Sequence, residues 1–148
     1  MRINGAGCAL IDNLYNNVSF DGKPFVSYRS RHAGDGGIIV GGLVFAEDLA
    51  EFARTPYDPL LTEITGKPMP DSRNLGGPAI IPIVHAAQLL VGSGIETAYY
   101  GIRGDDAGAD CIEQLLRDVP VDLSAYRRVP GPTPATDVLS DPACDEGR

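Results

Sequence analysis

Residues 99–108 read Tyr-Tyr-Gly-Ile-Arg-Gly-Asp-Asp-Ala-Gly, and this stretch decides how the chain divides into secondary-structure elements. The residues that lead into it, Glu96 to Ile102, are β-prone and predict a strand. Asp105 to Val119 predicts a helix, because its apolar residues share one face and acidic residues occupy its first turn. Those apolar residues are Ala109, Ile112, Leu115 and Leu116. Asp105 or Asp106 caps this helix in our interpretation.

A second helix is expected on the amino-terminal side of this stretch. Gly76-Gly77 precedes it, Pro78 suits its first turn, and Gly92-Ser93-Gly94 ends it. Pro82 lies deeper and removes a backbone donor, so we expect an irregular or kinked start. The apolar residues at helical spacing are Ile80, Ile81, Val84, Ala87, Leu90 and Val91. On the carboxyl side, beyond a proline-rich link, Ala135 to Ser140 predicts another strand.

The chain opens with an apolar run that ends in a carboxylate. Residues from Arg2 to Asp12 predict a buried strand, central in a parallel sheet. Asp12 is then expected at the carboxyl end of this strand, where open α/β sheets bind their ligands. The order strand, inserted segment, helix, strand, helix, strand indicates an α/β fold with a mostly parallel sheet flanked by helices.

The segment from about residue 14 to residue 73 interrupts this alternation. It is rich in glycine and aromatic residues, and we interpret its first part as extended strands joined by turns. Two short helices are predicted within it, from Glu47 to Arg54 and from Pro59 to Thr65. Because a connection of this length is too long to be structureless inside a compact domain, we interpret it as an inserted β-rich lid or an interface.

The length and amino-acid composition are typical of one acidic globular domain. A chain of 148 residues with 43% hydrophobic and 22% charged residues suits a single globular domain. The formal net charge of -8 and the lack of a basic run argue against nucleic-acid binding. The cysteines form no Cys-x-x-Cys pair, and no apolar run approaches the ~20 residues that span a bilayer. We therefore expect a cytoplasmic protein with reduced thiols, no membrane partner and no metal site.

Three stretches, taken in order, resemble the amino-terminal half of the ribokinase-like (PfkB) carbohydrate kinases. The first is the opening strand that ends at Asp12, and the second is Gly76-Gly77 at a helix start. The third is the run 99–108 followed by Leu115-Leu116, Val121-Asp122 and Thr133-Pro134-Ala135-Thr136. The resemblance implies that residues 1–148 form the amino-terminal part of one ribokinase-like domain, that residues 14–73 form its lid, and that the carboxy-terminal catalytic half is absent.

The resemblance also implies an activity and a site. Family members use ATP and Mg²⁺ to phosphorylate a hydroxyl of a sugar or sugar-like molecule, and their lids often pair to form a homodimer. Asp12 matches the aspartate that accepts hydrogen bonds from the hydroxyls of the acceptor, and Gly76 and Gly77 match glycines that shape the pocket floor. The catalytic base and the anion hole belong to the absent half, so the isolated 148 residues are expected to be inactive.

Ile81 departs from the family pattern, which has an asparagine at that position. An amide that could bind a sugar hydroxyl is replaced by an aliphatic group, so the usual sugar specificity is not implied. From the residues alone, Asp12 could instead cap a turn, and Gly76-Gly77 could be a simple helix entry. Two alternatives stay open: a non-catalytic small-molecule-binding or interaction module on the kinase scaffold, and a nucleotide-binding oxidoreductase on a Rossmann unit.

Three further features carry no chemistry in our interpretation. Gly5-Ala6-Gly7 is not a dinucleotide fingerprint, because Leu10 stands where the third glycine is needed. Gly34-Asp35-Gly36-Gly37 is interpreted as a turn of the lid. His32 and His85 are interpreted as a surface loop residue and a helix residue and not as a catalytic pair.

Overall fold

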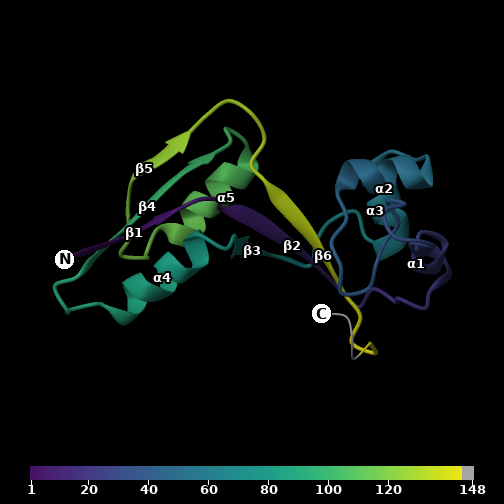
Figure 1. Ribbon diagram of the computed structural model, residues 1–148, viewed down its shortest axis with the longest axis horizontal. Helices are drawn as coiled ribbons and strands as arrows, with labels where there is room; N and C mark the ends of the chain where they lie inside the picture. Colours follow the sequence, from purple (N-terminus) through teal and green to yellow (C-terminus); the bar gives the residue numbers. More distant parts are fainter. Residues whose placement is uncertain (145–148) are drawn as a thin grey trace. The chain divides into compact units, whose positions relative to one another are not determined.

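The computed structural model of the chain describes residues 1–144 (Figure 1). Its elements in chain order are β1 (Arg2–Ala6), β2 (Leu10–Asn16), α1 (Lys23–Ser27), α2 (Ala46–Ala53), α3 (Tyr57–Thr65), β3 (Ser72–Gly76), α4 (Ile80–Leu89), β4 (Glu96–Arg103), α5 (Ala107–Leu116), β5 (Asp122–Arg128) and β6 (Ala135–Ser140). Two compact units result. Unit 1 comprises Met1–Asn13 and Arg73–Asp137, and unit 2 comprises Leu14–Ser72 and the described residues from Val138 onward. The chain is a mixed α/β protein, as predicted.

Unit 1 is built on a parallel sheet with the strand order β1-β4-β5. Gly5 of β1 stands opposite Tyr99 of β4, and Gly101 of β4 stands opposite Tyr126 of β5. Helix α4 leads into β4 and α5 connects β4 to β5, and Figure 1 shows both helices alongside these strands. Parallel neighbours require such crossovers, because the chain must travel back before the next strand begins.

Both helices of unit 1 pack on one face of the parallel sheet. One core joins residues of α4 and α5 to the inward-facing tyrosines of β4 and β5. Its buried members are Ala9, Ile11, Ile80, Ile83, Val84, Tyr99, Ile112, Leu116 and Tyr126. Successive strand residues point to opposite faces, so the neighbours of Tyr99 along β4 point away from this core. Ala98 on this second face is 1% exposed, whereas Tyr100 and Ile102 are 44% and 62% exposed, so the face is open to solvent around these two residues.

The opening segment forms two strands, so the predicted single strand from Arg2 to Asp12 is wrong. β1 ends at Ala6, Gly7 adopts a φ of 146°, and β2 begins at Leu10. The two strands belong to different sheets, since β1 pairs with β4 whereas β2 lies between β3 and β6. Asp12 consequently lies inside β2 and not at the carboxyl end of a strand. The apolar run continues across the break, which is why hydrophobicity does not reveal the change of sheet.

The second sheet has the strand order β3-β2-β6. β3 runs antiparallel to β2, because the residue before its start bonds to Leu14 while its end at Gly76 lies beside Asp12. β6 runs parallel to β2, because backbone hydrogen bonds along this pair advance in the same direction on both strands. Those bonds run from Ile11 N to Pro134 O (3.0 Å) and from Val18 N to Ser140 O (3.0 Å).

The elements next to residues 99–108 agree with the predictions. β4 and β6 lie where strands were expected, and α5 begins after Asp106 and ends at Leu116. α4 spans Ile80–Leu89, so it begins after Pro78 and not with it. Pro82 is therefore the third helical residue, within the first turn, where a backbone N–H has no intrahelical acceptor to lose.

β5 is a strand that the sequence pattern does not predict. Its residues, Asp-Leu-Ser-Ala-Tyr-Arg-Arg, are mostly polar, because it is an edge strand of the parallel sheet. Tyr126 is its one buried residue, with its ring centroid 5.2 Å from that of Tyr99. This contact between residues of different strands, and not a local apolar pattern, holds β5 in place.

The regular secondary structure of unit 2 is mainly helical, which contradicts the prediction of a β-rich lid. α2 and α3 lie where two short helices were predicted, and α3 begins at Tyr57 because Pro56 is its N-cap. α1 was not predicted. Within residues 17–71, extended pairing is limited to an isolated bridge between Arg29 and Ile38. Aromatic residues that favour strands pack instead in a core, whose buried members are Tyr15, Val18, Phe20, Phe25, Ile38, Leu49, Leu60 and Ile64.

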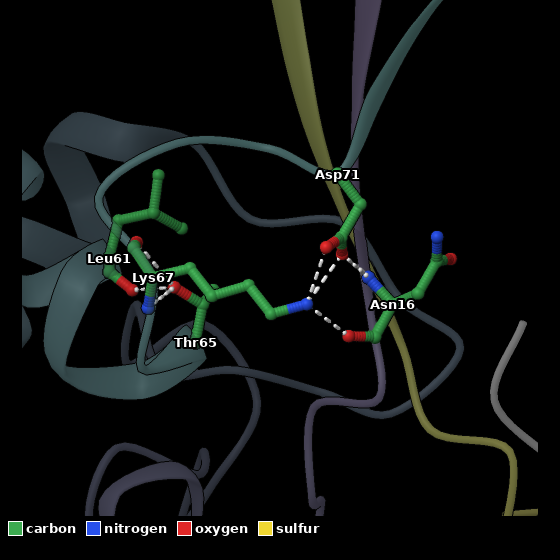
Figure 2. Close-up of polar contacts among 5 residues, drawn as sticks. All are labelled: Asn16, Leu61, Thr65, Lys67 and Asp71. Carbon is green, nitrogen blue, oxygen red and sulfur yellow. Dashed lines mark hydrogen bonds and ion pairs between the residues drawn. The ribbon is translucent and has the colours of Figure 1, made fainter.

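A polar network closes the base of the inserted segment in unit 2 (Figure 2). Lys67 Nζ donates to both carboxylate oxygens of Asp71 (2.7 and 2.6 Å) and to the carbonyl oxygen of Asn16 (2.9 Å). The Asn16 N–H donates to Asp71 Oδ2 (2.7 Å). Because β2 ends at Asn16 and β3 begins directly after Asp71, this network ties together the two ends of the insertion.

Candidate functional site

Asp12 lies in the middle of β2 with its side chain against the end of β3. A Cβ placed on Gly76 would lie 2.6 Å from Asp12 Cγ and 2.5 Å from Leu10 Cδ1, so Gly76 and Asp12 are in direct contact. The Asp12 carboxyl is half-buried, and burial raises its pKa above the ordinary value for aspartate. Within residues 1–144 it has no hydrogen-bond or ion-pair partner. A partly desolvated carboxylate without a partner is a candidate for ligand binding.

Gly77 lies directly over the link between β1 and β2. Its φ of 118° is a backbone conformation that favours glycine, and a Cβ there would lie 2.6 Å from the Cys8 carbonyl oxygen. The turn from β3 into α4 therefore packs closely on the backbone of Cys8 and Ala9. The structure brings Asp12 together with Gly76 and places Gly77 against the neighbouring link, all within unit 1.

This arrangement suits a ligand that carries adjacent hydroxyl groups. The two oxygens of an ionised carboxylate accept hydrogen bonds in a fixed relative orientation, which can hold two hydroxyls of one molecule. The absence of side chains on Gly76 and Gly77 makes room for the Asp12 carboxylate and for the Cys8 carbonyl oxygen, so these glycines permit the close packing that places the carboxylate. The site provides orientation, but it contains no second carboxylate or histidine placed to remove a proton from a bound hydroxyl among the residues described as contacting Asp12 and Gly76.

Ile81, which stands where the resembled family has an asparagine, packs against the hydrophobic core of unit 1. Its side chain is partly buried and packs against the core of unit 1 together with Leu75 and Ala79. An aliphatic side chain is the residue type that such packing favours. The structure thus gives Ile81 a structural role and no polar role toward a ligand.

A polar ladder across the second sheet was not predicted from the sequence. Asn13 Nδ2 donates to Asp137 Oδ1 (3.0 Å), and Arg73 Nε donates to Asn13 Oδ1 (3.2 Å). Since strand residues alternate between faces, this ladder lies on the opposite face of β2 from Asp12. Its partners are 60 and 124 residues apart in sequence, so only the tertiary structure reveals it.

Asp106 has an architectural role, as the sequence predicted. Its carboxylate accepts from Ala109 N (3.0 Å), which caps α5, and from Thr133 N (3.0 Å) and Thr133 Oγ1 (2.5 Å). The hydrogen bonds from Thr133 and the N-cap bond lower the pKa of Asp106 to about 2. Asp105 accepts from Gly131 N (3.1 Å). The two aspartates therefore join the start of α5 to the link that leads into β6.

We expect Asp106→Ala to lower the free energy of unfolding by about 1–2 kcal/mol at neutral pH, the usual effect of losing an N-cap. Because the folded-state pKa is depressed, the stabilising effect of the charge is present above the unfolded pKa and is lost as pH falls toward 2. The stability difference between the wild type and Asp106→Asn should therefore shrink between about pH 4 and pH 2 in urea denaturation.

Asp118→Asn is the matched control, because Asp118 is an exposed aspartate just beyond the other end of α5. It should change stability by no more than about 0.5 kcal/mol. Equal losses in Asp106→Ala and Asp118→Asn would contradict the capping role.

The remaining sequence motifs lie where the sequence predicted them. Asp35 in the glycine-rich stretch closes a turn by accepting from the backbone N–H groups of Arg31 (2.7 Å), His32 (3.2 Å) and Gly37 (3.0 Å). These bonds hold the pKa of Asp35 well below its ordinary value. His32 is an exposed loop residue and His85 is an exposed residue of α4.

Two kinds of feature are absent from the part of the chain that the structure describes. No group of three or more His, Cys, Asp or Glu side chains lies together in a way that could hold a metal ion. No helix there is both long enough and apolar enough to cross a membrane.

A scan of the chain against models of protein families finds no match, and a search among curated proteins finds no similar sequence. The class that the structure itself defines is a mixed α/β protein with a parallel sheet, a second sheet and a half-buried, unpaired carboxylate in contact with a glycine.

Proposed function

We propose that this chain forms the acceptor-binding part of an ATP-dependent carbohydrate kinase of the ribokinase-like type. The acceptor is a sugar or sugar-like small molecule, and one of its hydroxyls receives the γ-phosphoryl group of ATP. The contact between Asp12 and Gly76 carries this proposal, because it pairs the carboxylate and the glycine that the sequence resemblance assigns to acceptor binding. Asp12 binds and orients the hydroxyls, and the Gly76-Gly77 backbone forms the adjoining floor.

The catalytic base and the site for nucleotide and Mg²⁺ belong to a carboxy-terminal half in this proposal. The described residues offer no cluster of metal ligands, so they do not fit Mg²⁺ by themselves. The second face of the parallel sheet supports a further packing layer, because Tyr100 and Ile102 expose large apolar side chains there. Positioning and charge stabilisation supply nearly all of the catalysis of phosphoryl transfer, so the acceptor site alone should be inactive.

The cysteines support the compartment that we propose. Cys8, Cys111 and Cys144 are all free thiols, which suits a reducing environment. The proposal therefore includes a cytoplasmic location.

A second candidate is a small-molecule-binding module that keeps the kinase scaffold without catalysis. Ile81 favours this alternative, since its aliphatic side chain packs on the core where the family has an asparagine. Both candidates predict acceptor binding at Asp12, and only the first predicts phosphoryl transfer.

Acceptor binding is tested by titrating the ¹⁵N-labelled chain with a panel of pentoses, hexoses, nucleosides and inositols. At least one member should shift the amide signals of residues 10–12 and 76–77, and Asp12→Asn should weaken this binding by at least about tenfold. Transfer from γ-³²P-ATP to the same compound is then measured with the 148 residues alone and with a chain extended by its downstream reading frame.

The kinase proposal requires transfer by the extended chain and none by the 148 residues. Binding without transfer by the extended chain would favour the non-catalytic module. Turnover by the isolated 148 residues would contradict the assignment of the catalytic base to a carboxy-terminal half. If no compound of the panel shifts the amide signals of residues 10–12 and 76–77, the proposed acceptor site is wrong.

A further inference from the structure

Unit 2 contains an open groove of about 560 Å³ that is separate from the Asp12 site. It lies between the glycine-rich loop, the loop that follows it, and helix α2. We call it the α2 groove. Its lining residues are Ser30, Gly34, Asp35, Gly36, Gly37, Ile39, Leu43, Val44, Phe45, Asp48, Glu51 and Phe52. The volume lies within the range of about 300–1,000 Å³ that is typical of small-molecule sites.

The wall of the α2 groove is closely packed. A Cβ on Gly36 would lie 2.7 Å from the carbonyl oxygen of Asp48, and one on Gly37 would lie 2.6 Å from Ser30 Cα. The carboxylate of Asp35 holds the same loop through three backbone N–H groups. The loop is therefore fixed against α2 by contacts that leave no room for a side chain, and the groove has a defined shape.

The α2 groove presents large apolar side chains to solvent. Ile39, Leu43 and Phe45 are 52%, 74% and 67% exposed. Single exposed apolar residues are common, but three that line one groove form a patch of the kind that binds a partner or a ligand. An apolar ligand body that covers these side chains would be stabilised by the apolar area that it removes from water.

The charged residues that line the α2 groove are all acidic. Asp35, Asp48 and Glu51 line it, and none of its lining residues is Lys, Arg or His. Asp48 and Glu51 are three residues apart on α2, so they lie on the same side of the helix. Within residues 1–144, their side chains have no hydrogen-bond or ion-pair partner. The guanidinium of Arg31 lies instead over the ring of Phe52, 5.8 Å from its centroid.

We propose that the α2 groove binds a small organic cation, an ammonium group on an apolar body. The apolar body covers Leu43 and Phe45, and the ammonium group lies beside Asp48 and Glu51. Charge complementarity selects this class, because an anion would be repelled and a neutral apolar molecule would leave the two carboxylates uncompensated. A second copy of the chain is disfavoured, because a symmetric contact at this groove would bring the same carboxylates together.

The test uses three small probes with similar apolar bodies: 2-phenylethylammonium, 2-phenylethanol and 3-phenylpropionate. Each is titrated into the ¹⁵N-labelled chain, and the amide signals of residues 30–52 are followed. The ammonium probe should bind about tenfold more tightly than the alcohol, and the carboxylate probe should not bind. Added salt should reduce the preference for the ammonium probe.

The variant Asp48→Asn/Glu51→Gln should remove the preference for the ammonium over the alcohol. Glu47→Gln is the matched control, because Glu47 is an acidic residue of the same helix that does not line the groove. Should the double variant fail to fold, Leu43→Ser replaces it, because Leu43 is largely exposed. Leu43→Ser should weaken both the ammonium and the alcohol while leaving their ratio unchanged.

Four results would overturn this proposal. They are equal binding of the alcohol and the ammonium, an equal effect of Glu47→Gln and the double variant, no shift in residues 30–52 with any probe, and a dimer in sedimentation equilibrium that Leu43→Ser dissociates. The last result would assign the groove to contact between copies of the chain. The proposed kinase function is independent of all four, since no residue of the Asp12 site lines the α2 groove.

Discussion

Asp12→Asn is expected to weaken acceptor binding by at least about tenfold while leaving the fold intact or making it more stable. The carboxylate is half-buried and lacks a partner within residues 1–144, so burial disfavours its charged form. An amide of the same size removes the charge, but it replaces one of the two acceptor oxygens with a donor. Because a hydrogen bond to a charged group contributes about 1.5–3 kcal/mol, loss of one such bond and of the charge on the remaining acceptor should weaken acceptor binding by at least about tenfold.

The pH dependence distinguishes this role from a structural one. The pKa of Asp12 is raised on folding, so the folded state holds the proton more tightly than the unfolded state. The contribution of Asp12 to stability is therefore greatest at acid pH and declines as pH rises through its raised pKa. Relative to Asp12→Asn, the wild type should lose stability between acid and neutral pH in urea denaturation.

Asp118→Asn, which changes an exposed aspartate of the same unit, is the control and should alter neither binding nor stability. A large loss of stability in Asp12→Asn at neutral pH would mean that Asp12 is a structural residue. Unchanged acceptor binding in this variant would contradict the proposed site.

Gly76→Ala is expected to damage both stability and binding. The new methyl group would lie 2.5 Å from Leu10 Cδ1 and 2.6 Å from Asp12 Cγ, and Gly76 is buried. The side chains of Leu10 and Asp12 must both move to relieve this steric overlap. Overpacking of this kind lowers the free energy of unfolding by about 1–3 kcal/mol. The displaced carboxylate would no longer be aligned with the floor of the site, so acceptor binding should be lost as well.

Gly94→Ala provides a comparison at a position with open space. Gly94 has a φ of 75°, and a Cβ there would meet no other atom within 4 Å, so alanine should cost only about 1–2 kcal/mol of backbone strain. It should leave acceptor binding unchanged. Gly76→Ala with unchanged binding, measured at a temperature where the variant is folded, would show that the contact with Asp12 does not position the carboxylate.

Local signals in the sequence predicted much of the secondary structure. α2 and α3 are delimited by prolines and by residues with positive φ at their ends, and α5 begins at an aspartate whose side chain caps it. These signals act over three or four residues, so a short stretch of sequence contains them completely. The structure shows that Asp12 and Gly76 are in contact, and their assignment to an acceptor site stays a prediction.

Features that depend on distant residues were not predicted. The aromatic residues of the insertion suggested strands, but Phe20 and Phe25 stack with ring centroids 4.4 Å apart in a mainly helical unit. β5 depends on the packing of Tyr126 against Tyr99. The α2 groove forms because the glycine-rich loop packs against Asp48 of α2. No periodic pattern in the sequence predicts this contact.

The sequence by itself determined the mixed α/β class, the helices α2, α3, α4 and α5, the strands β4 and β6, and the capping role of Asp106. Only the tertiary structure decided that the chain changes sheets between Ala6 and Leu10, which places Asp12 inside a strand and beside Gly76. The physical reason is that helix ends and strand patterns arise from neighbours in the chain, whereas the partner of a strand is chosen by packing between segments far apart in sequence.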